Sequence, residues 1–281
     1  MPTDLWRSVL YLPASNVRAI EKARTLSCDV AVLDLEDAVA PEAKLAARAA
    51  AVEAVRSGGF GPRLGVRINA LDTEWGVDDL KALARTTVSL IVAPKVESAD
   101  GVRALSAGLP ASAALIAMIE TPAALMRLER IAGAGGALAG LMLGVNDLAA
   151  TLGTGVSTDR EPLKPWLAAT VAAARMHGLA VLDGVFNRID DAGGLAAECA
   201  QGRLYGFDGK SLIHPSQIAA ANAAFAASPD EVAHAEAIVA AFDDPASNGR
   251  GAIRVGGSMV ERLHLASAER LLERHRMASK G

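Results

Sequence analysis

The chain has 281 residues, of which 51% are hydrophobic, a formal net charge of −4 and two cysteines. This length allows one large hydrophobic core, and the thin spread of Lys and Arg with few aromatic residues argues against a nucleic-acid partner. Two cysteines in apolar stretches argue against a disulfide framework, and neither a signal segment nor a membrane helix is evident, so we expect a cytoplasmic protein without membrane contact.

Short apolar runs alternate with segments of helical periodicity along most of the chain. Because the runs are apolar on both faces, we expect a parallel sheet covered by helices, and eight such units close into a TIM (β/α)8 barrel. An open doubly wound sheet needs a glycine fingerprint that the first strand-helix turn lacks. The predicted strands are 8–12, 30–36, 63–69, 90–96, 115–120, 140–147, 180–186 and 205–213, and the predicted helices include 16–26, 41–56, 75–85 and 122–131.

A C-terminal helical extension, residues 228–281, follows the predicted catalytic barrel domain of residues 1–227. The sequence Ser228-Pro-Asp-Glu is a capping box and predicts the start of a helix. An Asn-Gly pair at 248 predicts a turn, and Ser258 is the predicted cap of a last helix. The extension is too small to fold alone, so we expect it to pack on the barrel or on a neighbouring subunit.

Two acidic residues, Glu120 and Asp147, each end an aliphatic run on neighbouring predicted strands. Chemistry in parallel barrels lies at the carboxyl ends of the strands, so both carboxylates should point into one mouth. Two carboxylates with waters and substrate oxygens suit magnesium. Zinc is less suitable, because none of the five histidines lies in a metal-ligand spacing. The alternative is that both acids only cap the helices after them.

Glu36 and Asp37 end the second predicted strand, and Arg67 lies near the end of the third. Adjacent strand residues face opposite sides, so at most one of the two acids can bind a metal directly, while the other orients water or pairs with a base. Arg67 offers a planar pair of donors to a substrate carboxylate. A structural ion pair of Arg67 with Glu36 or Asp37 is the alternative. Lys95 could form a Schiff base, but we expect Glu97 to keep it protonated.

The chain contains, in order, RSVLYLPASNVRAIEKA, DLEDAVAPEAKLAAR, VRIN, APKVE, IETP, GVNDLAATLG, GFDGKSLIHPSQI and GSMVERLHLASA. This series, from Arg7 to about Ala268, resembles the citrate lyase β-chain-like family of acyl-CoA lyases. The resemblance implies a magnesium-dependent TIM barrel enzyme with one metal ion per subunit, assembled as a homotrimer or hexamer. It implies a carbon–carbon lyase of the oxo-acid-lyase type, whose substrate is a coenzyme A thioester.

Residue roles follow from the same resemblance, motif by motif. Glu120 and Asp147 correspond to the metal ligands of the family, and Arg67 to the arginine that contacts the keto-acid carboxylate and the reacting oxygen. Glu36 and Asp37 correspond to the acids around metal-bound water. The residues expected near the coenzyme A nucleotide are Ser15, Asn16, Arg18 and Lys22.

One position departs from the family pattern. In similar lyases, an aspartate that follows the GSM motif is supplied by a neighbouring subunit as the acid/base, and Glu261 takes that place here. The extra methylene matters, because a displacement of about 1 Å can reduce a rate by two orders of magnitude. The alternative is that Glu261 only places a negative charge in the first turn of the last helix.

Several functions stay open at this point. The first is cleavage or formation of malyl-CoA or citramalyl-CoA, with pyruvate or glyoxylate as the 2-keto acid and an acyl-CoA as the other product. The second is a citrate lyase β subunit that converts a citryl-acyl-carrier-protein thioester to oxaloacetate. A third is a protein that binds a keto acid and magnesium without turnover. An aldolase of sugar-derived keto acids ranks last, because such enzymes lack the GSM segment.

Overall fold

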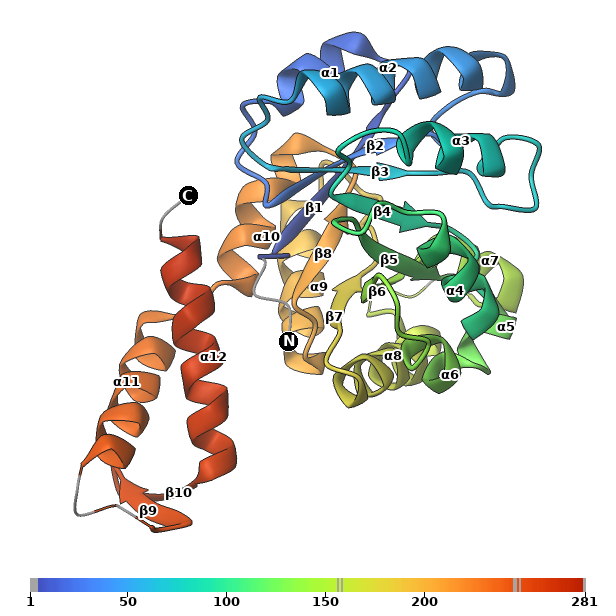
Figure 1. The fold of residues 1–281 in the computed structure, drawn as a ribbon. Helices are drawn as coiled ribbons and strands as arrows, with labels where there is room; N and C mark the ends of the chain where they lie inside the picture. The colour runs from blue at the N-terminus through green and yellow to red at the C-terminus, as the bar shows by residue number, and fades with distance from the viewer. Residues whose placement is uncertain (1–4, 156, 158, 245–246, 248, 280–281) are drawn as a thin grey trace. The chain divides into compact units, whose positions relative to one another are not determined.

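The computed structural model describes residues 5–155, 157, 159–244, 247 and 249–279 (Figure 1). The chain forms two compact units, mainly residues 6–225 and 226–281. None of the described helices has the length and apolarity needed to cross a membrane.

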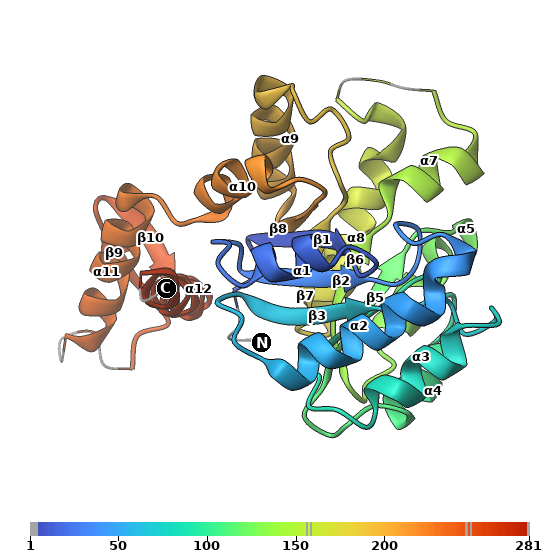
Figure 2. The same ribbon diagram turned by 90° about the horizontal axis from the view of Figure 1, so that it is seen from above.

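The first unit is a closed barrel of parallel strands, paired in chain order from β1 to β8, and β1 also pairs with β8. The predicted TIM barrel is therefore confirmed. Figure 2 shows helices such as α2 and α3 lying outside the strands. The strands are β1 (Ser8–Pro13), β2 (Val30–Asp34), β3 (Arg63–Arg67), β4 (Leu90–Ala93), β5 (Ala114–Ile119), β6 (Leu138–Leu143), β7 (Ala180–Asp183) and β8 (Gly209–Leu212).

Six of the predicted strands are longer than the observed ones. β2 ends at Asp34, because the Asp34 carboxylate accepts hydrogen bonds from the N–H groups of Glu36 (2.9 Å) and Ala38 (3.0 Å) and turns the chain. β6 ends at Leu143, and β8 starts at Gly209, later than predicted, because α9 continues to Tyr205. Glu36, Asp37 and Asp147 therefore follow strands rather than lie on them.

Helices connect the strands as predicted, although the predicted helix 122–131 is divided into two. Proline occupies the first turn of two 3₁₀ segments, Pro41–Ala43 and Pro215–Gln217, and of α5, as expected from its missing N–H. The helices of this unit are α1 (Val17–Ala23), α2 (Lys44–Ser57), α3 (Gly76–Leu83), α4 (Ala99–Ala107), α5 (Pro122–Leu125), α6 (Leu128–Ala132), α7 (Val145–Leu152), α8 (Lys164–Met176), α9 (Ala192–Tyr205) and α10 (Ile218–Phe225), and a third 3₁₀ segment is Glu161–Leu163.

The interior of the barrel is filled by aliphatic side chains from alternate strand positions, including Val30, Val32 and Val92. This alternation continues toward the carboxyl ends of the strands, where the next inward positions are Asp34 on β2 and Arg67 on β3. An apolar interior thus ends in a polar layer at the mouth of the barrel.

The second unit contains a helical hairpin, α11 (Pro229–Asp243) and α12 (Arg262–Ala278), with an antiparallel pair, β9 (Ala252–Val255) and β10 (Ser258–Glu261). The predicted capping box is confirmed, because Ser228 Oγ accepts from the Glu231 N–H and Glu231 Oε2 accepts from the Ser228 N–H. The predicted cap at Ser258 is wrong, since Ser258 begins β10 and Glu261 directly precedes α12. In the predicted turn, Asn248 lies outside the described residues, and Gly249 has φ +73°.

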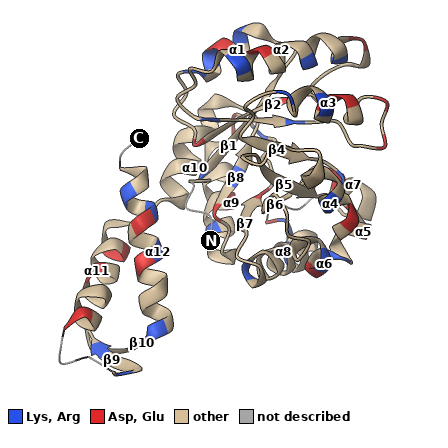
Figure 3. Cartoon of the chain, in the orientation of Figure 1, with Lys and Arg blue, Asp and Glu red and all other residues tan. Residues whose placement is uncertain are grey.

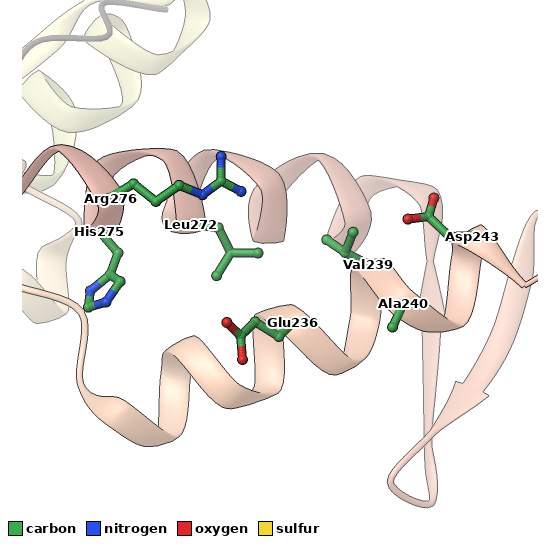
Figure 4. A pocket seen from close by; sticks show the side chains of 7 residues that line it. All are labelled: Glu236, Val239, Ala240, Asp243, Leu272, His275 and Arg276. Atoms are coloured by element: carbon green, nitrogen blue, oxygen red, sulfur yellow. The ribbon is translucent and has the colours of Figure 1, made fainter. Parts of the chain in front are cut away.

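A groove of about 270 Å³ runs between α11 and α12. Figure 4 shows Glu236 on α11 and Leu272 and His275 on α12 lining it from the two sides. The charges of the two helices differ: α11 carries acidic side chains and no Lys or Arg, whereas α12 carries several arginines and two glutamates (Figure 3).

Candidate active site

The centre of the barrel mouth is a buried ion pair between Arg67 and Asp34. Arg67 Nε donates to Asp34 Oδ1 (2.7 Å) and Nη2 donates to Asp34 Oδ2 (2.6 Å). Burial opposes the charge of Arg67, but the hydrogen bonds and charge of Asp34 outweigh it and hold the pKa of Arg67 well above its ordinary value. Arg67 is therefore a permanent cation whose orientation is fixed by two parallel bonds.

Sequence reasoning missed Asp34. It gave an ion pair of Arg67 with Glu36 or Asp37 as the alternative to substrate binding, and both of these acids contact Arg67 Nη1, at 3.0 Å and 3.3 Å. The strand alternation could have identified Asp34, because Val30 and Val32 face inward and Asp34 is the next residue in that series. The expectation that Glu36 and Asp37 face opposite sides was wrong, because they lie in a turn after β2.

The acidic turn after β2 brings a second cation into the site. Lys95 Nζ donates to Glu36 Oε1 over 3.1 Å. Burial raises the pKa of Glu36, and the charges of Arg67 and Lys95 counter this only in part. The pKa of Lys95 is raised, because the charge and hydrogen bond of Glu36 outweigh the effect of burial. Lys95 is thus protonated, as the sequence predicted, but through Glu36 rather than Glu97.

Glu120 directly follows β5 and is 2% exposed. The Lys95 backbone N–H donates to Glu120 Oε1 (2.7 Å). Burial raises the pKa of Glu120 to about 7, with contributions from the charges of Glu36 and Asp147. The charge of Asp147 thus acts on Glu120, and the two predicted metal-binding carboxylates lie within electrostatic reach of each other.

Gly144 provides the space beside Glu120. A Cβ at this position would overlap Glu120 Oε2 and lie 2.5 Å from Glu120 Cβ, so no larger residue fits without movement of the carboxylate. Gly144 also follows β6 and directly precedes α7, which places Asp147 in the first turn of that helix. The sequence analysis did not identify this glycine as part of the predicted site.

The donor set fits a hard divalent cation. Five carboxylates (Asp34, Glu36, Asp37, Glu120 and Asp147) face three cations (Lys44, Arg67 and Lys95), which leaves two excess negative charges when all are ionised. Buried Glu36 Oε2 accepts no hydrogen bond, because its contact with Arg67 has the distance of an ion pair without hydrogen-bond geometry. Within the described residues no three His, Cys, Asp or Glu side chains form a metal-binding group. The protein could therefore supply two carboxylates, with water and substrate supplying the remaining oxygens.

A buried lysine, Lys44, supports the turn after β2. Lys44 Nζ donates to the carbonyl oxygens of Leu35 and Glu36 and to Asn69 Oδ1, each over 2.7 Å. Asn69 in turn donates to Asp79 Oδ2 from both its backbone and its side chain. This chain of contacts connects α2, the segment after β3 and α3 to the acidic turn.

The Tyr11 ring packs against the Arg67 guanidinium. The guanidinium carbon lies 4.7 Å from the centre of the Tyr11 ring, within the range of a cation–π contact. The hydroxyl donates to Met142 Sδ (2.9 Å), and burial raises the pKa of Tyr11. Tyr11 therefore contributes an uncharged aromatic surface to the site.

The remaining predicted site residues lie elsewhere in the fold. The residues expected near the nucleotide are all exposed and lie from just before α1 to its last turn, and Asn16 Oδ1 caps that helix by accepting from the Ala19 N–H. Glu261 belongs to the second unit, where its N–H donates to His264 Nδ1. Both roles stay predictions. The residues of the nucleotide prediction are Ser15, Asn16, Arg18 and Lys22.

Comparisons with known proteins identify relatives along almost the whole chain. A model of the HpcH/HpaI aldolase/citrate lyase family matches residues 7–215. A (3S)-malyl-CoA thioesterase of Cereibacter sphaeroides is 44% identical over 268 residues, which are 95% of this chain and 93% of that protein. An L-malyl-CoA/beta-methylmalyl-CoA lyase of the same species is 34% identical and covers 97% and 95% of the two chains. The structure of CitE from Mycobacterium tuberculosis with magnesium, acetoacetate and coenzyme A has a TM-score of 0.79 at 33% identity and covers 98% of this chain and 100% of that chain.

Proposed function

This chain belongs to the HpcH/HpaI aldolase/citrate lyase family, and on that premise we propose that it is a magnesium-dependent enzyme acting on a malyl-CoA-type 3-hydroxyacyl thioester. The observation that carries the proposal is the layer of Glu120, Asp147 and Arg67 at the barrel mouth, within the set of five carboxylates and three cations that has two negative charges in excess. Both kinds of relative, the thioesterase and the lyase, are named for malyl-CoA.

Glu120 and Asp147 are the proposed metal ligands. Magnesium bound there would supply Lewis-acid charge that favours an ionised substrate hydroxyl. Gly144 leaves room beside Glu120 Oε2, while Lys95 fixes Oε1. The magnesium in the CitE structure supports this choice of ion.

Carbon–carbon cleavage is the first candidate reaction. The substrate hydroxyl loses its proton, the bond between the hydroxyl-bearing carbon and the carbon next to the thioester breaks, and a 2-keto acid forms. The electron pair remains on the thioester as an enolate, which then takes up a proton to give the acyl-CoA. Arg67, held by Asp34, is the proposed donor to developing negative charge. Glu36 and Asp37 are proposed to orient water, and Glu261 of a neighbouring subunit to donate the proton.

Thioester hydrolysis is the second candidate reaction. It is favoured by the higher identity to the malyl-CoA thioesterase, 44%, than to the lyase, 34%. Here water adds to the thioester carbonyl, the carbon–sulfur bond breaks, and the products are the hydroxy acid and free coenzyme A. Similar lyases have aspartate where this chain has Glu261. A different acid at this position is consistent with a change in protonation of the enolate, a step that only the lyase reaction needs.

The assembly and nucleotide contacts complete the proposal. A homotrimer or hexamer would allow the second unit of one subunit to reach the site of another. Ser15, Asn16, Arg18 and Lys22 are the proposed contacts of the coenzyme A nucleotide, and the coenzyme A in the CitE structure supports a nucleotide site in this fold.

Product analysis separates the candidates. The protein is incubated with malyl-CoA and citramalyl-CoA, with magnesium or with EDTA, and keto acid, hydroxy acid, acyl-CoA and free coenzyme A are measured. Keto acid with acyl-CoA identifies the lyase, and hydroxy acid with free coenzyme A identifies the thioesterase. Activity must disappear in EDTA and in Glu120→Gln. Binding of magnesium and a keto acid without any product would refute both reactions and favour the carrier-protein subunit or the non-catalytic binding protein.

A further inference from the structure

The cations at the barrel mouth differ in their access to a ligand. The Arg67 side chain is 9% exposed, and Asp34 occupies its Nε and Nη2. Lys44 is buried, and its Nζ already donates to three oxygens. The Lys95 side chain is 46% exposed and makes one hydrogen bond, to Glu36. An ammonium group has three donors, so Lys95 retains donors for an incoming anion.

The backbone at Lys95 is strained. Its φ of +51° places it among only two described non-glycine residues with positive φ. Such conformations are costly and cluster at functional sites. Here the strained turn serves two contacts at once, because the Lys95 N–H binds Glu120 Oε1 and the side chain reaches Glu36. The same residue thus connects a proposed metal ligand with the acidic turn.

We propose that Lys95 binds the free carboxylate of the substrate, an inference that rests on the proposed function. Glu36 holds the ammonium in place before the substrate arrives, and the incoming carboxylate accepts a hydrogen bond from a remaining donor. Arg67 cannot bind this carboxylate through Nε or Nη2 without leaving Asp34. It therefore contributes its positive charge and the donors of Nη1. The ligands of Lys95 are therefore small 2-keto acids and the carboxylate end of 3-hydroxyacyl thioesters.

Loss of this ammonium should weaken binding of the carboxylate selectively. A hydrogen bond to a charged group corresponds to roughly a 10- to 100-fold change in affinity. Magnesium binding should change little in Lys95→Met, because the backbone N–H to Glu120 remains. A role in structure alone would lower the melting temperature without this selective effect on the keto acid.

Calorimetry on the purified full chain tests the proposal, with glyoxylate and pyruvate titrated at saturating magnesium and with magnesium titrated alone. We expect Lys95→Met to weaken keto-acid binding at least 10-fold and to raise the thioester KM more than it lowers kcat. Lys95→Arg should remain within about threefold of wild type. Lys95→Asn is a second variant without the charge, since Asn tolerates positive φ. Lys81→Met, at a lysine with a 69% exposed side chain on α3, is the matched control.

The possible results separate this inference from the proposed function. Keto-acid affinity in Lys95→Met and Lys95→Asn within twofold of wild type would overturn the role of Lys95 while leaving the proposed function intact. A wild-type protein that binds no keto acid with magnesium would overturn both. An equal loss in Lys81→Met would also overturn the role of Lys95, because it would attribute the effect to net charge.

Discussion

Asp34 and Arg67 are direct partners in the register of β2 and β3, and two parallel hydrogen bonds join their side chains. The same carboxylate accepts the N–H groups of Glu36 and Ala38. Asp34 therefore ends the strand, shapes the acidic turn and holds the guanidinium. Because β-strand ends are rigid, this arrangement fixes the positive charge of the mouth before any substrate binds.

Asp34→Asn should lower the free energy of unfolding by about 3 kcal/mol, since it leaves the buried Arg67 without its partner charge. Urea unfolding at neutral pH measures this loss. Asp100→Asn is the matched control, because Asp100 pairs with Arg103 at an exposed helix surface and should change stability by less than about 1 kcal/mol. Equal effects of the two variants would contradict a buried role for Asp34.

Gly144→Ala should displace the Glu120 carboxylate, because the added Cβ would overlap Oε2. We expect magnesium affinity to fall at least 10-fold, together with a loss of about 1–3 kcal/mol of stability from overpacking. Calorimetry and thermal unfolding measure the two effects. Gly193→Ala on α9 is the control, since the nearest atom to its Cβ lies 3.9 Å away and its stability should be unchanged or higher. Unchanged magnesium binding in Gly144→Ala would remove Glu120 from the metal site.

Lys44→Met should destabilise the acidic turn, because two carbonyl groups and the Asn69 amide lose a common donor. A cost of about 2–3 kcal/mol follows from leaving buried polar groups unpaired. Activity should fall even at temperatures where the variant stays folded, since Glu36 and Asp37 lie on that turn. Lys81→Met again provides an exposed lysine for comparison. A variant with lower stability but wild-type kcat and KM would limit Lys44 to a structural role.

The barrel was predictable because its evidence is repeated along the chain. Each apolar run is separated from the next by a helical segment, so an error of a few residues at one strand end does not change the topology. Prolines 41, 122 and 215 and the capping box at Ser228 identified helix starts, since these signals depend on local backbone chemistry.

The site was predictable only in part, because strand ends depend on tertiary contacts. Three acids occur within four residues after Leu33, and only the structure reveals that Asp34 pairs with Arg67 while Glu36 reaches Lys95. The buried Lys210 illustrates the opposite case. Its Gly-Lys-Ser sequence resembles part of a phosphate loop, but in the structure Lys210 binds Asp183 and Glu198. The order of residue types along the chain does not show which acid pairs with which Lys or Arg in the fold.

The titration of Glu120 predicts how magnesium binding depends on pH. Burial raises the pKa of this carboxyl from 4.5 to about 7, so in the metal-free protein a proton occupies the proposed ligand over the mildly acidic range. The proton and the cation compete, so magnesium affinity should be highest above pH 7 and should fall by up to about tenfold per pH unit below it. The stability of the metal-free protein depends on pH in the opposite direction to the magnesium affinity. The contribution of the protonated form to stability is complete below pH 4.5 and is lost as the pH rises through about 7.

Calorimetric titrations of magnesium from pH 5.5 to 8.5 measure the first effect, and urea unfolding in EDTA over the same range measures the second. Glu120→Gln should lose magnesium binding at every pH and should also lose the decrease in metal-free stability between pH 5 and 7, because its amide does not ionise. Glu97→Gln, at an exposed acid near Lys95, should keep both dependences. A magnesium affinity independent of pH in the wild type, with a stable fold throughout, would show that Glu120 is ionised before the metal arrives.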